Sequence, residues 1–478
     1  MNRQSNAYRV ERDIVGDVDV PAEAYYGVHT LRAIQNFPIT GHPVHPEMIW
    51  SIALIKKAAA ITNGKAGLLP VKLTQAIAAA CDEVMAEKLK DQFLTDPIQG
   101  GAGTSVNMNA NEVIANRAIE LLGGHKGEYA IVHPNDHVNY GQSTNDVYPS
   151  CGKLAAVRLM KPLYAALTAL RDAFNEKAEA FDGVLKMGRT QLQDAVPIRL
   201  GQEFRAYAIL VGRDIARLHT AENELRTLNL GGTAIGTGVN TNEVYTNRIV
   251  EAVCRLSGEH FEQAEDLIDS TQNLDCYVRV SSALKACAVG ISKICNDLRL
   301  MSSGPRAGFG EIMLPARQNG SSIMPGKVNP VIPEVMNQIA FGVIGNDTAI
   351  TMAAEAGQLE LNAFEPLIFY KLFDSIQTLT NGVRTLTENC VRGIVANEAR
   401  CHTMVEESAS VAAALCPYIG YVRASKLAKE SLASHTSVEK LALRDGLIPA
   451  QDLHALLDPY AMTVAPAVHR EVRSVVST

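Results

Sequence analysis

The sequence has few aromatic residues, no long apolar run and no excess of positive charge, and each absence excludes a class of protein. Phe, Trp and Tyr make up 5% of the residues, with Trp50 as the single tryptophan. The 44 Lys and Arg residues are outnumbered by 51 Asp and Glu residues, so the net charge of −7 does not attract a nucleic-acid backbone. An anionic substrate would need local donors. Nowhere do about 18 apolar residues follow one another, so we expect no transmembrane helix.

The N-terminal segment and the cysteines indicate a cytoplasmic protein. Residues 1–13 lack the apolar core of a secretory signal, so we expect no export. The nine cysteines are odd in number, and no two have the CxxC spacing typical of redox and metal sites. Free thiols in a reducing compartment are the simplest interpretation. A length of 478 residues, 47% of them apolar, predicts about three globular domains.

Long amphipathic helices dominate the middle of the sequence. Apolar residues recur there at alternating spacings of three and four, which is the period of a helix with one buried face. The most regular series is Leu284, Cys287, Ile291, Ile294, Leu298 and Met301. Five such segments of roughly 25 residues would give helices about 40 Å long. Helices of that length bury their apolar faces best in a bundle with shallow crossing angles, so we predict a mainly α fold.

The limits of this helical pattern predict three domains. Residues 1–140 mix short helices with loops rich in Gly, Asn and Pro, and the only strands that we expect are short pieces near the N-terminus. The long helices occupy residues 141–397 and form a central bundle domain. Residues 398–478 carry shorter amphipathic segments, broken at Pro417 and Gly420, and form a small C-terminal helical domain.

Polar, glycine-rich segments interrupt the helices and are candidate parts of a site, since donor-rich loops at helix ends often bind ligands. They are residues 100–109, 141–146, 188–194 and 320–330. The last one reads GSSIMPGKVNP. It does not fit a nucleotide-binding P-loop, because five residues separate Gly320 from Gly326 and Val328 follows the lysine. A plain surface turn would be the usual interpretation of such a segment.

The string GSSIMPGKVNP argues against a plain turn, because it resembles the signature of the fumarase/aspartase superfamily. Further blocks of that family occur in the same order. They are NMNANEV, HPNDHVN, QSTND, GRTQLQDA and SSGPRAG, which begin at residues 107, 133, 142, 188 and 302. The resemblance implies three mainly helical domains with a long central five-helix bundle. It also implies a homotetramer whose chains pair their bundles into one tetrameric helix core, with each active site built by residues of three chains.

Members of this family remove a proton from the carbon next to a carboxylate, which places a second negative charge on that carboxylate. Such an aci-carboxylate requires preorganised donors, each worth about 2.7–4 kcal/mol. By resemblance, the donors in this chain are Thr104, Ser143, Thr144 and Ser322. The resemblance implies a small dicarboxylate substrate and neither a cofactor nor a catalytic metal.

By the same resemblance, Ser321 is the catalytic base that takes the Cβ proton. A serine hydroxyl is a poor base in its ordinary state, so it must act as an alkoxide in a dry, donor-rich loop. Lys327 and Asn329 are expected to bind the second carboxylate, and Asn145 and Thr190 are expected to lie near the amine.

Within the family, this chain resembles the aspartases more than the fumarases. Fumarases typically read SGTQTNMN, QSSND and GRTHLQD where this chain has GAGTSVNMN, QSTND and GRTQLQD. Gln191 therefore takes the place of a fumarase histidine beside the substrate, and its amide cannot shuttle a proton. The aspartase resemblance implies reversible, non-oxidative deamination of L-aspartate to fumarate and ammonia. A fumarate hydratase and a non-catalytic helical scaffold are the alternatives, although intact Ser321, Lys327 and Asn329 argue against a scaffold.

His133 and His137 have the i, i+4 spacing with which a helix can bind a metal ion. Pro134 and Asn135 lie between them, so we expect a loop instead of a helix. A structural hydrogen-bonding role for His137 is the favoured interpretation, and we predict no metal site.

Overall fold

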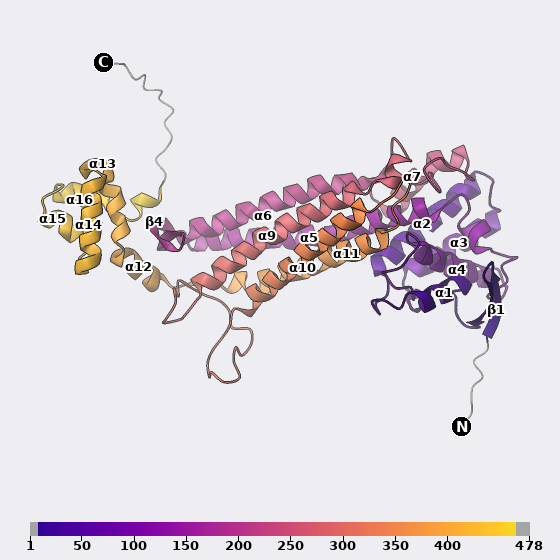
Figure 1. Cartoon of the computed structure of the whole chain (residues 1–478), viewed down its shortest axis with the longest axis horizontal. Coiled ribbons are helices and arrows are strands. Elements are labelled where there is room, and N and C mark those ends of the chain that lie inside the picture. Colours follow the sequence, from indigo (N-terminus) through magenta and orange to yellow (C-terminus); the bar gives the residue numbers. More distant parts are fainter. Residues whose placement is uncertain (1–7, 465–478) are drawn as a thin grey trace, which may run out of the picture. The chain divides into compact units, whose positions relative to one another are not determined.

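A computed structural model describes residues 8–464, most of them helical (Figure 1). The helices are α1 (Val28–Asn36), α2 (Pro46–Lys65), α3 (Val71–Met85), α4 (Thr104–Leu121), α5 (Thr144–Ala180), α6 (Leu200–Glu222), α7 (Glu243–Ser257), α8 (Asp269–Gln272), α9 (Asp275–Met301), α10 (Val331–Glu355), α11 (Glu365–Asn389), α12 (Glu398–Glu407), α13 (Cys416–Ile419), α14 (Tyr421–Ser434), α15 (Val438–Arg444) and α16 (Ala450–Leu456). The predicted mainly α fold is confirmed. None of the described helices is long and apolar enough to cross a membrane.

The five long helices expected from the apolar spacing are α5, α6, α9, α10 and α11, with 37, 23, 27, 25 and 25 residues. The apolar series is buried as expected in α5, α9 and α11, whereas in α10 Val335 is 39% exposed. In α9, the six residues from Leu284 to Met301 that define the series are at most 5% exposed.

Eight short strands in the described part of the chain pair into four two-stranded sheets, β1–β2, β3–β4, β5–β6 and β7–β8. The strands are β1 (Tyr8–Asp13), β2 (Gly16–Pro21), β3 (Leu185–Thr190), β4 (Gln193–Arg199), β5 (Thr227–Leu228), β6 (Glu262–Gln263), β7 (Ile312–Met313) and β8 (Val395–Ala396). The first pair matches the strands expected near the N-terminus. The expectation of strands only there is wrong, because the β3–β4 hairpin lies in the middle of the chain.

The described chain divides into two compact units, and each of the five long helices contributes residues to both. The first unit contains residues 8–166, 214–289 and 338–381, and the second contains residues 167–213, 290–337 and 382–464. The three-domain division at residues 140 and 397 stays a prediction. Of its outer domains, residues 1–7 and 465–478 lie outside the described part.

In the first unit, α2 packs against α3 and α7, and α3 packs against α4. Helix α2 has a favourable start, because the side chain of His45 accepts a hydrogen bond from the backbone N–H of Glu47. Pro46 occupies its first turn, where a missing N–H group costs nothing. Ile52 of α2 and Ile77 of α3 are 0% exposed, so these helices share a dry core.

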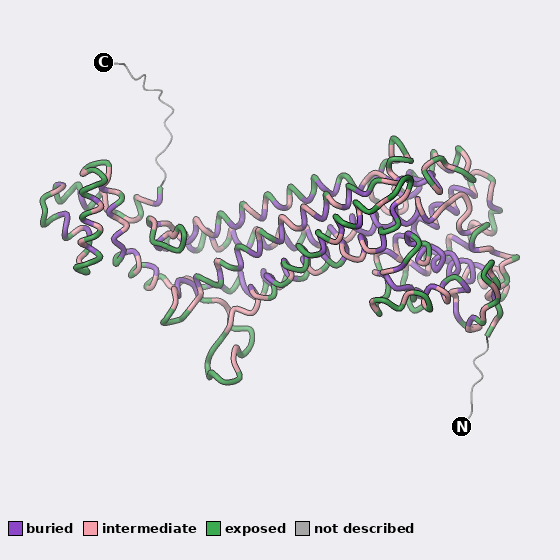
Figure 2. Tube along the Cα trace, in the orientation of Figure 1, coloured by how far each residue is buried: buried purple, intermediate pink, exposed green. Residues whose placement is uncertain are grey.

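In the second unit, residues 409–415 and the helices α13 to α16 surround a small core. Its centre consists of Leu415, Leu427, Leu441 and Leu453, which are at most 3% exposed. The unit also contains the β3–β4 hairpin and the loop between β7 and α10. Figure 2 shows that this loop is largely exposed.

Candidate active site

Thr104 is the first residue of α4 and follows a glycine-rich turn. Gly103, directly before it, has a φ of 89°, and a Cβ atom there would lie 2.4 Å from the ring of Tyr148. Glycine alone satisfies both requirements. The Thr104 hydroxyl is exposed and donates to the carbonyl of Gly101 at 2.7 Å. It therefore lies at the positive end of the helix dipole.

The start of α5 lies beside the start of α4. Asn107, in the first turn of α4, donates from Nδ2 to the hydroxyl of Thr144, the first residue of α5, at 3.1 Å. Two helix N-termini thus bring their partial positive charges to one place, which favours an anion. This arrangement suits the predicted role of Thr104, Ser143 and Thr144 as carboxylate donors.

Ser143 and Asp146 cap the start of α5 reciprocally. The Ser143 hydroxyl accepts from the backbone N–H of Asn145 at 3.2 Å, and the Asp146 carboxylate accepts from the backbone N–H of Ser143 at 2.9 Å. The Asn145 amide nitrogen donates to the carbonyl of Ala234 at 2.8 Å. Asn229 donates from Nδ2 to the backbone carbonyl of Asn145 at 3.0 Å. The segment is therefore held both by its own helix and by residues 229–234.

A buried lysine lies behind this segment. Lys56 is 0% exposed, and its amine donates to Asn139 Oδ1 at 2.6 Å and to Gln142 Oε1 at 3.0 Å. Burial disfavours the charged form and lowers the pKa of Lys56 to about 7. Asn139 Oδ1 also accepts from Asn107 at 3.3 Å. The amine thus supports the network that reaches Thr144.

Thr190 and Gln191 lie at the exposed tip of the β3–β4 hairpin in the second unit. Thr190 pairs with Gln193, so Gln191 and Leu192 form a two-residue turn with φ values of 53° and 62°. Such turns normally use Asn and Gly, because a positive φ is costly for other residues. Backbone strain of this kind is typical of functional sites with rigid surroundings.

A cluster of buried charges supplies the rigid surroundings. The carboxylate of Glu311, which is 0% exposed, accepts from Arg189 at 2.7 Å and lies 3.2 Å from the amine of Lys186. A regular strand would place Lys186 and Arg189, three residues apart, on opposite faces. In this hairpin the register shifts between Met187 and Arg189, where Gly188 of β3 faces two residues of β4, and both side chains contact Glu311. A Cβ atom at Gly188 would lie 2.8 Å from the carbonyl oxygen of Val196.

Ser321, Ser322, Lys327 and Asn329 lie on one loop between β7 and α10. The backbone N–H of Gly320 donates to the carbonyl of Lys327 at 2.9 Å and closes the neck of the loop. Asn329 adds a bond from Nδ2 to the carbonyl of Gly320 at 2.6 Å. One chain therefore brings these four predicted site residues together.

The Ser321 hydroxyl has backbone donors of its own. Its oxygen accepts from the N–H groups of Ile323 at 3.2 Å and Met324 at 2.9 Å. Hydrogen bonds to an ionised oxygen are stronger than those to a neutral one, so two such donors favour the negatively charged form. The loop thus supplies the donors that a serine base requires, but it is largely exposed instead of dry.

His133 and His137 lie at a five-residue π-helical turn, Pro134–Val138. His137 Nδ1 accepts from the backbone N–H of His133 at 2.8 Å, and His133 Nδ1 accepts from that of Asp136 at 3.1 Å. The structural role expected for His137 is confirmed. The expected loop is wrong, because a proline can occupy the first position of a helical turn without losing a hydrogen bond.

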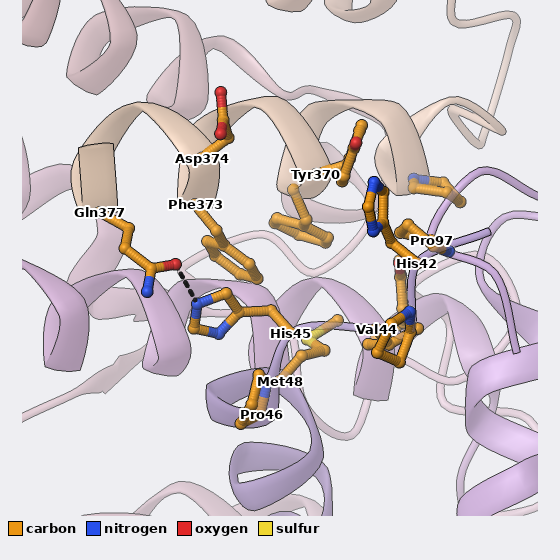
Figure 3. A pocket seen from close by; sticks show the side chains of 14 residues that line it. His42, Val44, His45, Pro46, Met48, Pro97, Tyr370, Phe373, Asp374 and Gln377 are labelled. Atoms are coloured by element: carbon orange, nitrogen blue, oxygen red, sulfur yellow. Dashed lines mark hydrogen bonds between the residues drawn. The ribbon is translucent and has the colours of Figure 1, made fainter. Parts of the chain in front are cut away.

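A pocket of about 370 Å³ in the first unit contains none of the predicted site residues. Its lining includes His45 and Phe373, and His45 Nε2 lies 3.1 Å from Gln377 Oε1 (Figure 3). His45 Nδ1 accepts from the backbone of Glu47, so Nε2 donates to Gln377 and the ring is neutral. Burial also lowers the pKa of His45. With both nitrogens engaged, this imidazole is a poor candidate for a general base.

The predicted site residues thus fall into two groups. Thr104, Ser143, Thr144 and Asn145 lie in the first unit, and the others lie in the second. The 37 residues of α5 lie between Ser143 and the hairpin along the chain. Sequence reasoning missed Lys56 and residues 229–234. The glycine-rich string GGTAIGTG, which begins at residue 231, is the signal that could have indicated the latter segment.

Comparison with known proteins gives consistent matches over nearly the whole chain. A family described as lyase matches residues 16–345, and one described as the fumarase C C-terminus matches residues 411–464. An aspartate ammonia-lyase from Bacillus sp is 52% identical over 455 residues, which cover 95% of this chain and 97% of that protein.

Two solved structures share the fold. A crystal structure of fumarate lyase:delta crystallin from Brucella melitensis, bound to cobalt, has a TM-score of 0.93 and 49% identity, and the match covers 96% of this chain and 100% of that one. A recombinant class II fumarase from Schistosoma mansoni has a TM-score of 0.92 and 33% identity, with 96% and 99% covered.

Proposed function

Since the chain belongs to the lyase family, we propose that it catalyses the reversible, non-oxidative deamination of L-aspartate to fumarate and ammonia. Its identity to an aspartate ammonia-lyase is well above its identity to a class II fumarase. The observation that carries the proposal is the pair of helix N-termini, α4 and α5, beside an asparagine whose amide nitrogen is already bound. The first feature suits a carboxylate, and the free amide oxygen suits an ammonium group.

In this proposal, the first unit binds one end of aspartate. Thr104, Ser143 and Thr144, with the N–H groups of the two helix starts, hold the carboxylate next to the carbon that loses its proton. Asn145 offers Oδ1 to the ammonium group. The buried amine of Lys56 adds positive potential behind the carboxylate, in a place where water does not screen it.

Ser321 acts as the base on the Cβ proton. Its alkoxide takes the proton, and the electron pair of the C–H bond moves into the carboxylate to give the aci-carboxylate. The pair then returns to form the C=C bond, while the C–N bond breaks and ammonia leaves with its electrons. Ser322 is a further donor to the aci-carboxylate, and the N–H groups of Ile323 and Met324 favour the alkoxide.

Lys327 and Asn329 bind the second carboxylate in this scheme. The Lys327 side chain is exposed on the loop, and Asn329 keeps one amide hydrogen beyond the one that it donates to Gly320. Thr190 and Gln191, at an exposed hairpin tip, present oxygen acceptors to the amine.

We further propose that the chain acts as a homotetramer with composite sites. Phe341 and Met352 of α10 are 63% and 67% exposed, and Ile344 between them is 36% exposed. Spacings of three and eight put these side chains on one face of the helix, which is an apolar surface that another copy would cover. The number four comes from the family resemblance. Helix α5, about 55 Å long at 1.5 Å per residue, lies between Ser143 and Thr190 along the chain, which favours a site shared between copies.

A cytoplasmic location belongs to the same proposal. All nine cysteines are free thiols in the structure, and seven of them are buried. Buried reduced cysteines are typical of proteins that fold in a reducing compartment.

A spectrophotometric assay tests the reaction, because fumarate absorbs where aspartate and malate do not. Fumarate should form from aspartate and not from malate. Formation from malate would establish a hydratase, and formation from neither would establish a scaffold.

A complementation experiment tests the shared site. Asn145→Ala and Ser321→Ala tetramers, each nearly inactive, are mixed, dissociated and reassembled. Activity should partly return, because some hybrid sites contain both native residues from different copies. A mixture of Ser321→Ala and Lys327→Ala should recover nothing, since both residues belong to one closed loop. Recovery in the second mixture, or none in the first, would contradict the proposed arrangement.

A further inference from the structure

Asp146 is a buried carboxylate that binds backbone groups from two segments. It is 0% exposed, and one oxygen accepts from the N–H of Ser143 at 2.9 Å. The other oxygen accepts from the N–H groups of Gly231 at 3.0 Å and Thr233 at 3.2 Å. Among residues 8–464, no basic side chain forms an ion pair with it. A buried charge is costly unless it is paired or fully hydrogen-bonded, so these three amides account for its presence.

The turn that Asp146 binds is strained. Gly231 has a φ of 94°, and Thr233 has a φ of 53°. A positive φ is an outlier for a β-branched residue and persists only where the surroundings enforce it. The Asp146 oxygen that accepts from both N–H groups helps to hold this conformation, together with backbone bonds such as that from the N–H of Gly232 to the carbonyl of Asn229 at 3.0 Å.

The next residue of the turn connects it to the site. The carbonyl of Ala234 accepts from Asn145 Nδ2 at 2.8 Å, and this bond identifies the nitrogen and the oxygen of the amide. In the described part of the chain, Asn145 Oδ1 accepts no hydrogen bond. The amide is thus held with its nitrogen engaged and its oxygen available.

We propose that Asp146 is a positioning residue: by holding residues 231–234 against the start of α5, it fixes the Asn145 amide with its oxygen toward the ammonium group of aspartate. This inference rests on the proposed function. If the turn shifts, the Ala234 carbonyl moves away and the amide is free to rotate. Its NH₂ group can then face the ammonium group, and because both groups are hydrogen-bond donors, no hydrogen bond forms between them. Asp146 would therefore act on ammonia selectively and leave the binding of fumarate carboxylates largely unchanged.

Asp146→Asn tests this in the reverse reaction, where the KM values for ammonia and fumarate are measured separately. Asparagine can keep its one oxygen on the N–H of Ser143, and its NH₂ group then faces the N–H groups of Gly231 and Thr233, so the turn loses its acceptor while the start of α5 keeps its own. We expect the KM for ammonia to rise about 10- to 100-fold, which is the size of effect that a displacement of a binding group by about 1 Å produces. The KM for fumarate should change less than about twofold. Gly231→Ala displaces the same turn through its positive φ while keeping the carboxylate, and should give the same pattern.

Asp347→Asn is the matched control. Asp347 is also a buried aspartate, and it accepts from the Ser281 hydroxyl at 2.8 Å and pairs with Lys285, both on α9, with no hydrogen bond to residues 231–234. Its replacement should lower the melting temperature and leave the ratio of the two KM values unchanged. A change of that ratio in Asp347→Asn would show that any buried charge has this effect, and would overturn the selective role.

The pH dependence gives a further test. Burial raises the pKa of Asp146 to about 6, with Lys56, Tyr245 and Cys151 as the other titratable groups that face it. Below that pH, parent Asp146 is protonated and resembles the asparagine variant. We divide the KM for ammonia of the variant by that of the parent, because the titration of ammonium affects both values equally and cancels in the ratio. This ratio should fall toward 1 below about pH 6. A ratio that stays constant from pH 8 to pH 5.5 would argue against Asp146.

The decisive measurement is a double-mutant cycle. Asp146→Asn is introduced into Asn145→Ala, which has no amide to orient. If Asp146 acts through Asn145, the second change should no longer raise the KM for ammonia, whereas independent effects multiply. A parent enzyme that forms no aspartate from fumarate and ammonia overturns the proposed function. An active parent with multiplying effects overturns the present inference alone.

Discussion

Replacing Lys56 with methionine should make the protein more stable at neutral pH and less active. Methionine keeps the length of the apolar stem but removes the charge and two hydrogen bonds. Because Lys56 is fully buried, its pKa is lowered from 10.5 to about 7. The unfolded chain therefore keeps this proton up to about pH 10.5, while the folded protein releases it above about pH 7. Between these values the unfolded state binds more protons, so stability rises with pH.

The magnitude follows from the two pKa values. Each pH unit in this window contributes about 1.4 kcal/mol, so at pH 7 the buried amine destabilises the fold by about 4 kcal/mol relative to a neutral group, and at pH 10 by about 1 kcal/mol. Methionine removes this penalty but leaves the amide oxygen of Gln142 without its donor, which costs about 1–3 kcal/mol. Lys56→Met should therefore be more stable than the parent by about 1–3 kcal/mol at pH 7, and should lose that advantage at pH 10.

Urea unfolding at pH 7 and pH 10 measures this difference, at one protein concentration because assembly contributes to apparent stability. Lys57→Met is the control, since the Lys57 amine pairs with Asp82 and is not sealed in the core. Its stability difference from the parent should not show the same dependence on pH. A difference between Lys56→Met and the parent that is equal at both pH values would refute the reasoning. Activity should fall in Lys56→Met at every pH, because Asn139 and Gln142 lose the group that holds them.

Ser321→Ala should lower turnover about 10²–10⁴-fold without unfolding the protein, and activity within tenfold of the parent would exclude Ser321 as the base. Light scattering should give about four times the chain mass of 51.5 kDa, and a monomer mass at micromolar concentration would contradict the tetramer. Aspartate should be preferred over malate by about 10⁴–10⁵-fold in kcat/KM, and comparable rates would favour the hydratase. Asn145→Ala should reduce aspartate turnover about 100-fold, and Gln191→His should reduce it less, both measured by fumarate formation. A larger loss of turnover in Gln191→His than in Asn145→Ala would contradict the roles given to these two amides.

The long helices could be predicted because burial repeats along them. Each apolar residue of the α9 series marks one turn that faces the core. Because α9 has 27 residues, the spacing repeats often enough to be distinguished from a chance pattern. The β3–β4 hairpin gave no such signal. Its strands have six and seven residues, and the turn between them uses Gln191 and Leu192 instead of Asn and Gly. The strand that leads into the turn is held by the tertiary contacts of Arg189 and Lys186 with Glu311, and such contacts leave no local pattern in a sequence.

The same limit explains which site residues could be found. Ser321, Lys327 and Asn329 lie within nine residues of one another, and one block of sequence contains them all. Asp146 and residues 231–234 contribute to the candidate site through contacts across about 85 positions of chain. Their types, an aspartate and a glycine-rich turn, have many ordinary uses, so only the geometry distinguishes them. Thr233 at a positive φ is a clear example, because its identity argues against the conformation that it adopts.

The negative net charge of the chain makes the local donors more important. A protein of net charge −7 offers no general attraction to a dianion such as fumarate, so the site must create its own positive potential. The starts of α4 and α5 supply fixed partial charges, and neither depends on pH. Lys56 supplies a charge that does depend on pH, yet it lies where salt screens it little. Lys327, by contrast, is exposed on the loop, so salt screens its charge. The chain thus has two kinds of positive potential for a dianion: fixed partial charges and a buried amine near the helix starts, and an exposed charge on the loop that salt screens.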